Sequence, residues 1–328
     1  MLPAARGPLE ILQFPNGSAN LTYLLRIGPH ELVLRRPPFG QIAPGAHDMK
    51  REFKVLSRLW RHFDRAPRAY LFCDDPAVLG ADFFVMERRR GEVVRETIPP
   101  PLRGHADVGR RLAFALVEAM AGLHALEPAA CGLADLGRPE GFVDRQLDGW
   151  AKRWALARSP EAGDEMERIH GRLARSRPAL SRVSIVHNDL KLDNCQFAPG
   201  DPDRVTSIFD WDMTTLGDPL VDLGTLLNYW PDPADTEAIQ RGTRPGLARM
   251  GLPTRAEITA RYAALTGVDP AAAAWWEAFA LWKTVVVVVQ LHRRWVRGES
   301  TDERMAHIAD RAPSLVAAAR AVLDDAGL

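Results

Sequence analysis

A short segment in the second half of the chain carries residue types that catalysis needs. Between two apolar stretches, His187 is followed two positions later by Asp189, and Asn194 comes five positions after that aspartate. The aspartate can accept the proton of an attacking hydroxyl group, and the asparagine carbonyl oxygen can bind Mg²⁺ on phosphate groups. One loop between two strands can point both side chains into one site, so the spacing predicts phosphoryl transfer.

A further carboxylate, Asp210, directly follows the apolar stretch Ser207–Phe209. A carboxylate at the end of a rigid strand is well placed to bind a hard cation such as Mg²⁺. We therefore predict Asn194 and Asp210 as metal ligands, while Asp212 either assists the metal or bonds the backbone of its own turn. An ordinary polar turn would explain the loop alone, but not the loop together with Asp210.

The overall composition limits the partners and the location of the protein. The chain of 328 residues contains 42 Lys or Arg and 42 Asp or Glu residues, and this zero formal charge favours neither nucleic acid nor an anionic membrane. Its 3 cysteines lack C-x-x-C spacing, which argues against a disulfide framework and against zinc. The first residues lack an apolar core, so no signal peptide is expected and a cytoplasmic location is predicted.

The longest apolar stretch, Ala271–Leu291, contains two charged residues, Glu277 and Lys283. Charges of this kind are costly inside a lipid bilayer, so the stretch predicts a buried helix and not a membrane span. The predicted partner is therefore a small molecule, with no nucleic acid and no membrane, and the oligomeric state is left open.

The elements that must position these residues differ between the two parts of the chain. The first ~90 residues alternate between turns and apolar stretches typical of strands. The predicted strands are Leu9–Phe14, Leu21–Arg26, Glu31–Arg36, Ala69–Cys73 and Phe83–Met86. Between them, Asp48 is expected to begin a helix whose apolar face contains Met49, Phe53, Leu56 and Trp60. A sheet with one helix packed on it is the result.

Helical spacing of apolar residues dominates from Ala106 onward, interrupted by a small β insertion around the catalytic segment. Asp218 followed by Pro219 is typical of a helix start. The pattern predicts an α+β fold with two lobes. Its predicted boundaries are residues 1–88 for a nucleotide-binding lobe and residues 89–328 for a catalytic and substrate-binding helical lobe.

Taken together, these segments resemble the aminoglycoside phosphotransferase and choline kinase superfamily, and in particular the kinase-like domains fused to acyl-CoA dehydrogenases in animals and their free-standing bacterial relatives. The similarity extends from about Leu9 to Arg297. The stretches that carry it are Phe14–Tyr23, Val33–Arg35, His187–Asn194 and Asp210–Pro219. The resemblance implies a protein-kinase-like fold, ATP or GTP as phosphate donor, Mg²⁺ and an alcohol acceptor.

The resemblance also implies roles for individual residues. Asp189 would be the base or the carboxylate that orients the substrate, with His187 bracing the loop and Lys191 reaching the γ-phosphate. Asn194 and Asp210 would bind Mg²⁺. Other residues would hold the nucleotide: Asn16, Gly17, Ser18, Ala19 and Asn20 through backbone N–H groups, Arg35 with its partner Glu52 at the phosphates, and Met86, Glu87 and Arg88 at the adenine.

Arg35 departs from the family pattern, which usually has a lysine at this place. Arginine is always charged and presents a planar fork that suits a carboxylate and a phosphate at once. Because it is longer and bulkier than lysine, the substitution bears on nucleotide affinity more than on the type of reaction.

The acceptor is the least determined part of the prediction. Two helices offer an apolar lining with cations, formed by Trp150, Arg153, Trp154, Trp282, Val286, Val289, His292 and Arg293. Such a surface favours a hydroxy acid or hydroxyacyl thioester over a polycation. The alternatives are an aminoglycoside or amino-alcohol kinase, a pseudokinase without turnover, and a metal-dependent hydrolase.

Overall fold

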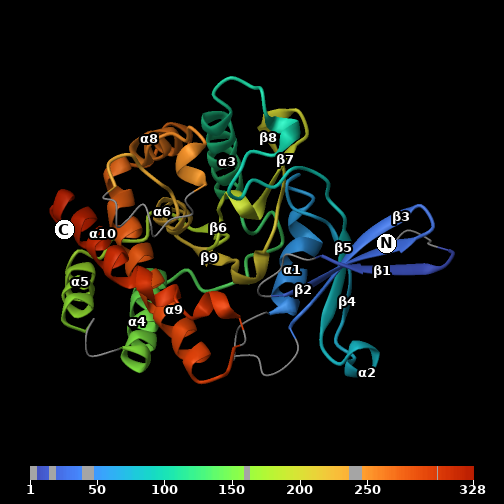
Figure 1. Cartoon of the computed structure of the whole chain (residues 1–328), viewed down its shortest axis with the longest axis horizontal. Helices are drawn as coiled ribbons and strands as arrows, with labels where there is room; N and C mark the ends of the chain where they lie inside the picture. The colour runs from blue at the N-terminus through green and yellow to red at the C-terminus, as the bar shows by residue number, and fades with distance from the viewer. Residues whose placement is uncertain (1–5, 15–19, 39–47, 159–162, 236–245, 301) are drawn as a thin grey trace.

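The computed structural model describes residues 6–14, 20–38, 48–158, 163–235, 246–300 and 302–328 of the chain. It has the predicted α+β architecture, with a sheet lobe at one end and a helical lobe at the other (Figure 1). The sheet contains 5 strands in the order β1-β2-β3-β5-β4, with antiparallel pairings. The strands are β1 (Leu9–Gln13), β2 (Leu21–Ile27), β3 (His30–Arg36), β4 (Ala69–Cys73) and β5 (Phe83–Glu87). The boundary between residues 88 and 89 stays a prediction.

Helix α1 (Met49–Leu59) packs against this sheet, and it begins where the sequence predicts. The Asp48 carboxylate accepts a hydrogen bond from the backbone N–H of Arg51 at 2.9 Å, which satisfies one of the free donors of the first turn. The buried face differs from the predicted one, because Phe53 and Trp60 are only partly buried. The residues that the helix buries are Met49, Glu52, Val55, Leu56 and Leu59. This rotation brings the carboxylate of Glu52 into the interior.

The helical lobe is built around helix α9 (Ala273–Val296), which packs against its neighbours along most of its length (Figure 1). Its other helices are α3 (Val108–His124), α4 (Phe142–Ala157), α5 (Gly163–Arg175), α6 (Leu220–Asn228), α8 (Arg255–Thr266) and α10 (Ala312–Asp325). The short helix α2 (Pro76–Leu79) lies in the sheet lobe. By length and composition alone α9 could cross a membrane, but 72% of its apolar window is buried inside the fold, as in a core helix.

Two small antiparallel ladders lie between the sheet and the helices, and they form the predicted β insertion. Strand β6 (Ser184–Val186) pairs with β9 (Thr215–Gly217), and β7 (Cys195–Ala198) pairs with β8 (Asp201–Ile208). The loop from β6 to β7 carries the predicted catalytic residues, and the loop from β8 to β9 carries Asp210. Each of these two loops connects one ladder to the other. The pairing of the strands therefore brings the two loops together.

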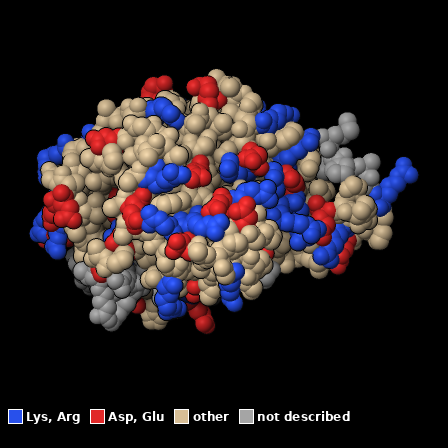
Figure 2. Space-filling model, turned by 90° about the horizontal axis from the view of Figure 1, so that it is seen from above, with Lys and Arg blue, Asp and Glu red and all other residues tan. Residues whose placement is uncertain are grey.

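The chain between the two lobes is attached to this insertion. Glu92 and Phe197 exchange two backbone hydrogen bonds, of 2.8 and 2.9 Å. Gly91 permits this approach, because a Cβ atom there would lie 2.7 Å from the Phe197 carbonyl oxygen. On the face of the molecule that Figure 2 shows, acidic and basic residues are interspersed, in keeping with the formal charge of zero.

Candidate active site

The carboxylate of Asp189 is the centre of the loop between β6 and β7. It accepts hydrogen bonds from Lys191 Nζ at 2.8 Å to Oδ1 and 2.6 Å to Oδ2. The Nδ2 group of Asn194 donates to Oδ2 at 3.0 Å. About a fifth of each side chain of the Asp189–Lys191 pair remains exposed, so the carboxylate is held in place but accessible.

The side chain of Asn194 is oriented by its own contacts. Its Nδ2 group also donates to the backbone oxygen of Asp189 at 2.7 Å, so the amide nitrogen is directed toward the catalytic loop. The amide oxygen is therefore left for another ligand. The backbone oxygen of Asn194 accepts a hydrogen bond from Phe209 N–H at 2.8 Å, which places this residue beside the segment that carries Asp210.

His187 connects the two loops. Its Nδ1 accepts from the backbone N–H of Asp189 at 3.3 Å, and its Nε2 donates to the backbone oxygen of Phe209 at 2.8 Å. Both contacts are satisfied by the neutral tautomer that carries its proton on Nε2. The ring also lies 4.8 Å from that of Trp211, measured between centroids. These are the contacts of a residue that positions the loop.

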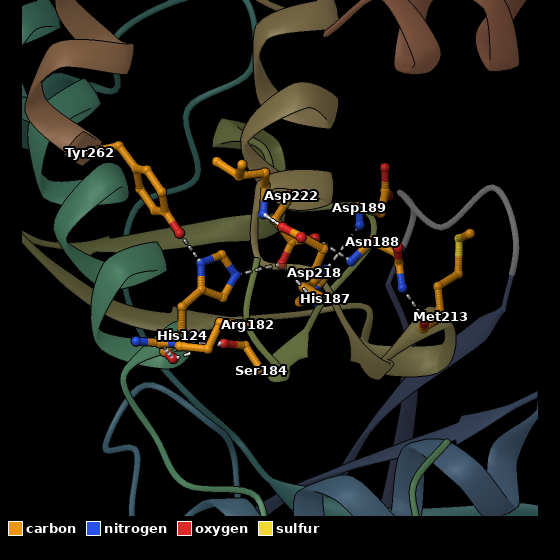
Figure 3. A network of polar contacts seen from close by, with 11 residues as sticks. His124, Arg182, Ser184, His187, Asn188, Asp189, Met213, Asp218, Asp222 and Tyr262 are labelled. Carbon is orange, nitrogen blue, oxygen red and sulfur yellow. Dashed lines mark hydrogen bonds and ion pairs between the residues drawn. The ribbon is translucent and has the colours of Figure 1, made fainter. Parts of the chain in front are cut away.

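A buried carboxylate in helix α6, Asp222, supports the catalytic loop (Figure 3). Its Oδ2 accepts from the backbone N–H of His187 at 2.7 Å and from His124 Nε2 at 3.0 Å, and its Oδ1 accepts from the N–H of Asn188 at 2.5 Å. The Nδ1 atom of His124 in turn accepts from the Tyr262 hydroxyl at 2.7 Å. Residues of three helices, α6, α3 and α8, thus support the loop between β6 and β7.

The electrostatics of this network favour the ionised aspartate. Burial alone would raise the pKa of Asp222, but the hydrogen bonds from His124 and from the backbone N–H of His187 lower it below its usual value. Asn188 completes the arrangement: it has a left-handed backbone with φ of 65°, and its side chain donates to the backbone oxygen of Met213 at 2.9 Å.

Arg35 joins the sheet lobe to the helical lobe. Its Nη1 lies 3.0 Å from Glu52 Oε1 and its Nη2 donates to Asp210 Oδ1 at 2.8 Å. Glu52 is fully buried and Arg35 nearly so, whereas about a third of the Asp210 side chain is exposed. The predicted Arg35–Glu52 pair is therefore present, and the arginine also holds a predicted metal ligand.

The three acidic side chains around Arg35 differ in their protonation. Burial raises the pKa of Glu52 to about 8, with Asp210 and Asp212 adding to the effect and Arg35 opposing it. Burial and the neighbouring Asp210 charge raise the pKa of Asp212 to about 6. Burial also acts on Asp210, but Arg35 outweighs it and lowers the pKa of this carboxyl. Asp210 is thus the carboxylate of this group that is most readily ionised.

The donor set fits a magnesium ion. Among the described residues, no group of three His, Cys, Asp or Glu side chains forms a ready-made metal cage. Mg²⁺ is usually held by one or two carboxylates together with water and phosphate oxygens, so few protein ligands are needed. The Asp210 carboxylate and the amide oxygen of Asn194 are hard oxygen ligands of this kind. The carboxyl group of Asp212, which is close enough for the charge of Asp210 to act on it, offers a third oxygen ligand.

The residues predicted to hold the nucleotide lie in different settings. Asn16, Gly17, Ser18 and Ala19 fall outside the described residues. Asn20 is buried, and its amide atoms have no hydrogen-bond partner in the part of the chain that the structure describes. Met86 is buried in β5, the Glu87 carboxylate accepts from the backbone N–H of Arg68 at 3.1 Å, and the guanidinium of Arg88 pairs with Glu31.

The predicted acceptor lining is wrong in part. Trp154 and Trp282 are almost completely buried in the core, as is Val286. Arg293 donates to the backbone oxygen of Leu156 at 2.8 Å, and His292 faces the backbone oxygen of Met305 at 3.3 Å. Helical spacing had placed these residues on common faces, but packing turned those faces inward.

Tyr229 and Lys283, which the sequence did not indicate as part of the acceptor site, lie close enough to Asp189 for its charge to act on them. The ring of Tyr229 is 5.2 Å from Lys191 Nζ, and that of Trp150 is 5.2 Å from Lys283 Nζ. Trp150 was predicted, and its neighbour Arg153 lies over the same ring with 4.4 Å between Cζ and the centroid. A charged residue inside an apolar helix was the only sequence signal for Lys283.

Comparison with known proteins agrees with this geometry. The model of a family described as the phosphotransferase enzyme family matches residues 10–258. A solved protein from Ralstonia eutropha, assigned as an aminoglycoside phosphotransferase, superposes with a TM-score of 0.78 at 25% identity over 98% of this chain and 94% of that one. A thermostable mutant of aminoglycoside phosphotransferase APH(4)-Ia, solved with ADP and hygromycin B, has the same fold, with a TM-score of 0.60 at 15% identity over 94% of this chain and 93% of that one.

Two mammalian proteins are similar in sequence. Acyl-CoA dehydrogenase family member 10 of Mus musculus is 30% identical over 302 residues, which are 90% of this chain and 27% of that protein. Acyl-CoA dehydrogenase family member 11 of Rattus norvegicus is 30% identical over 302 residues, which are 91% of this chain and 38% of that protein. The chain thus spans well under half the length of these relatives.

Fold and site together define a small-molecule phosphotransferase with a two-lobed, kinase-like architecture. The chain belongs to the phosphotransferase enzyme family, whose model covers both the sheet and the catalytic loops.

Proposed function

We propose that the protein transfers the γ-phosphate of ATP or GTP to the hydroxyl group of a small acid or its thioester, with Mg²⁺. The observation that carries this proposal is the convergence of Asp189, Asn194 and Asp210 from two loops that His187 links through hydrogen bonds of 3.3 and 2.8 Å. A base and two oxygen ligands for a cation are the protein groups that phosphoryl transfer to an alcohol requires.

Asp189 is the proposed base and orienting group. Its carboxylate would accept a hydrogen bond from the acceptor hydroxyl, align the oxygen with the phosphorus atom and take the proton as the new bond forms. In the structure Lys191 occupies both carboxylate oxygens. Although burial opposes it, the charge of Asp189 raises the pKa of Lys191, so the amine stays protonated and would donate to a phosphate oxygen when the nucleotide is bound.

The nucleotide is proposed to lie between the lobes, with its phosphates near Arg35. The guanidinium presents a charged fork, already fixed by Glu52 and Asp210, that a phosphate oxygen can approach. Asn194 and Asp210 would hold the metal, which supplies neutralisation of the phosphate charge when it is bound. The unpartnered amide of Asn20 lies next to the loop predicted to cover the phosphates, and it supports this placement. The ADP in the APH(4)-Ia structure, which has this fold, supports a nucleotide between the lobes.

The acceptor is proposed to be a hydroxy acid or a hydroxyacyl thioester. Aromatic rings at Trp150 and Tyr229 provide apolar surface near Asp189, and each lies beside a cation. A multiply charged amine would meet unfavourable cations at this place, whereas an apolar chain with an anionic end would be favoured. The kinship with parts of acyl-CoA dehydrogenase family members is in keeping with acyl compounds as substrates.

A screen for transfer of labelled γ-phosphate tests the proposal. The purified chain with Mg²⁺ and either ATP or GTP is offered hydroxy acids, their thioesters, neutral alcohols and aminoglycosides. We expect phosphorylated hydroxyacyl products whose rate of formation rises with chain length, since each buried CH₂ contributes about 0.8 kcal/mol. Asp189→Asn serves as the catalytic control. Efficient phosphorylation of an aminoglycoside, with no hydroxyacyl product, would contradict the proposed acceptor, and no transfer to any alcohol would favour a pseudokinase.

A further inference from the structure

Lys283 is a charged residue in the middle of the core helix α9. Its neighbours Trp282, Thr284 and Val285 are buried, and its own side chain is partly buried. Burying an ammonium group is costly unless a carboxylate pairs with it, so buried lysines normally have such a partner. In the part of the chain that the structure describes, Lys283 makes no hydrogen bond and no ion pair, and its contact is with the ring of Trp150.

Two cations contact the ring of Trp150, one from the partly buried Lys283 and one from the exposed Arg153. Lys283 Nζ is 5.2 Å from its centroid, and the Cζ atom of Arg153 is 4.4 Å from the same centroid. The two cations come from different helices, α9 and α4, and neither has a carboxylate partner among the described residues. Two like charges close to one ring repel each other, so an anion bound beside them would stabilise the arrangement.

Lys283 lies within electrostatic reach of the catalytic loop. Burial lowers the pKa of its ammonium group, Arg153 and Lys191 act in the same direction, and Asp189 and Asp222 act against them. Neither carboxylate serves as its partner, because Asp189 is held by Lys191 and Asn194, while Asp222 already accepts three hydrogen bonds.

A purely structural role does not account for this lysine. A cation–π contact with one tryptophan is weaker than the interaction with an anion, and Met or Leu at this position would pack in the same core helix without any charge to bury. The remaining explanation is a ligand that supplies the missing negative charge when it is bound, close to Asp189.

We propose that Lys283, together with Arg153, binds the carboxylate of the acceptor, and that Trp150 packs against the acceptor's apolar chain. This inference rests on the proposed function and narrows it, because it selects a free hydroxy acid over the neutral thioester end. The hydroxyl group would lie at Asp189 while the carboxylate is held at the cation pair. Lys283 is thereby a specificity-determining residue. It recognises the negative charge of the acceptor's carboxylate, at the end of the molecule away from the reacting hydroxyl group.

The test is direct binding, which does not depend on turnover. Octanoate and octanamide share one chain and differ in charge, and neither carries a hydroxyl that can react. Calorimetry in the presence of Mg²⁺ and a non-hydrolysable ATP analogue measures both ligands on the wild type and on three variants. Lys283→Met removes the charge and keeps the length, Lys283→Arg keeps the charge, and Lys152→Met removes an exposed cation next to Arg153 as a matched control.

We expect the wild type to bind octanoate more tightly than octanamide. Lys283→Met should lose at least about tenfold in octanoate affinity, equivalent to about 1.4 kcal/mol, with octanamide binding unchanged. Lys283→Arg and Lys152→Met should stay close to the wild type. Equal binding of the two ligands by the wild type, no binding of octanoate, or an equal loss for both ligands in Lys283→Met would overturn the inference.

The two levels of the proposal fail in different ways. If phosphate is transferred to neutral alcohols with no effect of Lys283→Met, the phosphotransferase function stands and the carboxylate site is refuted. If octanoate binds in a manner that depends on Lys283 but no alcohol is ever phosphorylated, the carboxylate site stands and the proposed catalytic function is refuted.

Discussion

Replacing Asp222 by asparagine tests whether the position of the catalytic loop, and not only its composition, determines activity. The carboxylate accepts hydrogen bonds from His187 N–H, Asn188 N–H and His124 Nε2 at 2.7, 2.5 and 3.0 Å. An asparagine has one acceptor oxygen and one NH₂ group. If its oxygen keeps the contacts with His187 and His124, the NH₂ group faces the N–H of Asn188, and two buried donors are left opposite each other.

The expected loss of stability follows from these contacts. A buried donor left without a partner costs about 1–3 kcal/mol, and hydrogen bonds to a charged group contribute about 1 kcal/mol more than neutral ones. One lost bond and two weakened bonds give a decrease of about 3–5 kcal/mol in the free energy of unfolding. Because Asp189 follows Asn188 directly, a shift of the loop by about 1 Å would lower kcat by about 10²-fold.

Asp218 provides a matched control in the neighbouring turn. It is also fully buried, and it accepts from the backbone N–H groups of Ser181 and Leu220 at 2.7 and 2.9 Å, but among the described residues its side chain makes no hydrogen bond to the catalytic loop. Asp218→Asn should lower stability by about 2–4 kcal/mol, through one lost bond and one weakened bond, and should leave kcat within a few-fold of the wild type.

Urea unfolding measures stability, and steady-state kinetics with the best acceptor from the screen measures kcat for both variants at a temperature where each is folded. Nucleotide affinity, measured by calorimetry, should change little in either variant. Equal losses of kcat in the two variants, or a normal kcat in Asp222→Asn, would show that the carboxylate does not act through the loop.

Three further outcomes are expected. Asp189→Asn should lower kcat by about 10²-fold or more with nearly normal nucleotide binding, since it removes the base, and a variant with turnover close to the wild type would exclude Asp189 from the reaction. Asp210→Ala should weaken the binding of Mg²⁺ with a non-hydrolysable nucleotide by at least about tenfold, and more than Asn194→Ala, because it removes a charged ligand; calorimetry decides this, and unchanged binding would reassign Asp210. Burial raises the pKa of Glu277 from 4.5 to about 7, despite Arg255 at 3.3 Å, so the folded protein binds this proton more tightly and loses stability as pH rises through this range. Glu277→Gln removes the effect, and its stability relative to the wild type should rise by about 2–3 kcal/mol between pH 4.5 and pH 8; a constant difference in urea unfolding would refute the assignment.

Much of the fold was predictable because its signals are local. The alternation of apolar residues and turns predicted the strands of the sheet lobe, and the described structure contains each of them. Asp48 was predicted to begin the first helix, and it does so through a bond to a backbone group three residues away. These features depend on neighbours within a few positions, which a sequence displays directly.

The catalytic segment was predictable for the same reason. His187, Asp189 and Asn194 lie within eight consecutive positions, and their mutual contacts form inside one loop. Their identity and spacing predicted phosphoryl transfer before any tertiary structure was considered. What the spacing did not contain was the support of the loop, because Asp222 reaches it across 34 and 35 positions of the chain.

Only the tertiary structure decided which helical faces meet the site. Periodicity shows that Trp150 and Trp154 share a face, but not that Trp154 turns into the core while Trp150 remains partly exposed and contacts two cations. It likewise gave no sign that Arg35 holds Asp210, 175 positions further along the chain. Such contacts arise when separate elements pack, and the sequence pattern of one element does not specify the surface of another. The type of reaction could therefore be predicted from the sequence, whereas the acceptor-binding surface depends on how α4, α6 and α9 pack around Asp189.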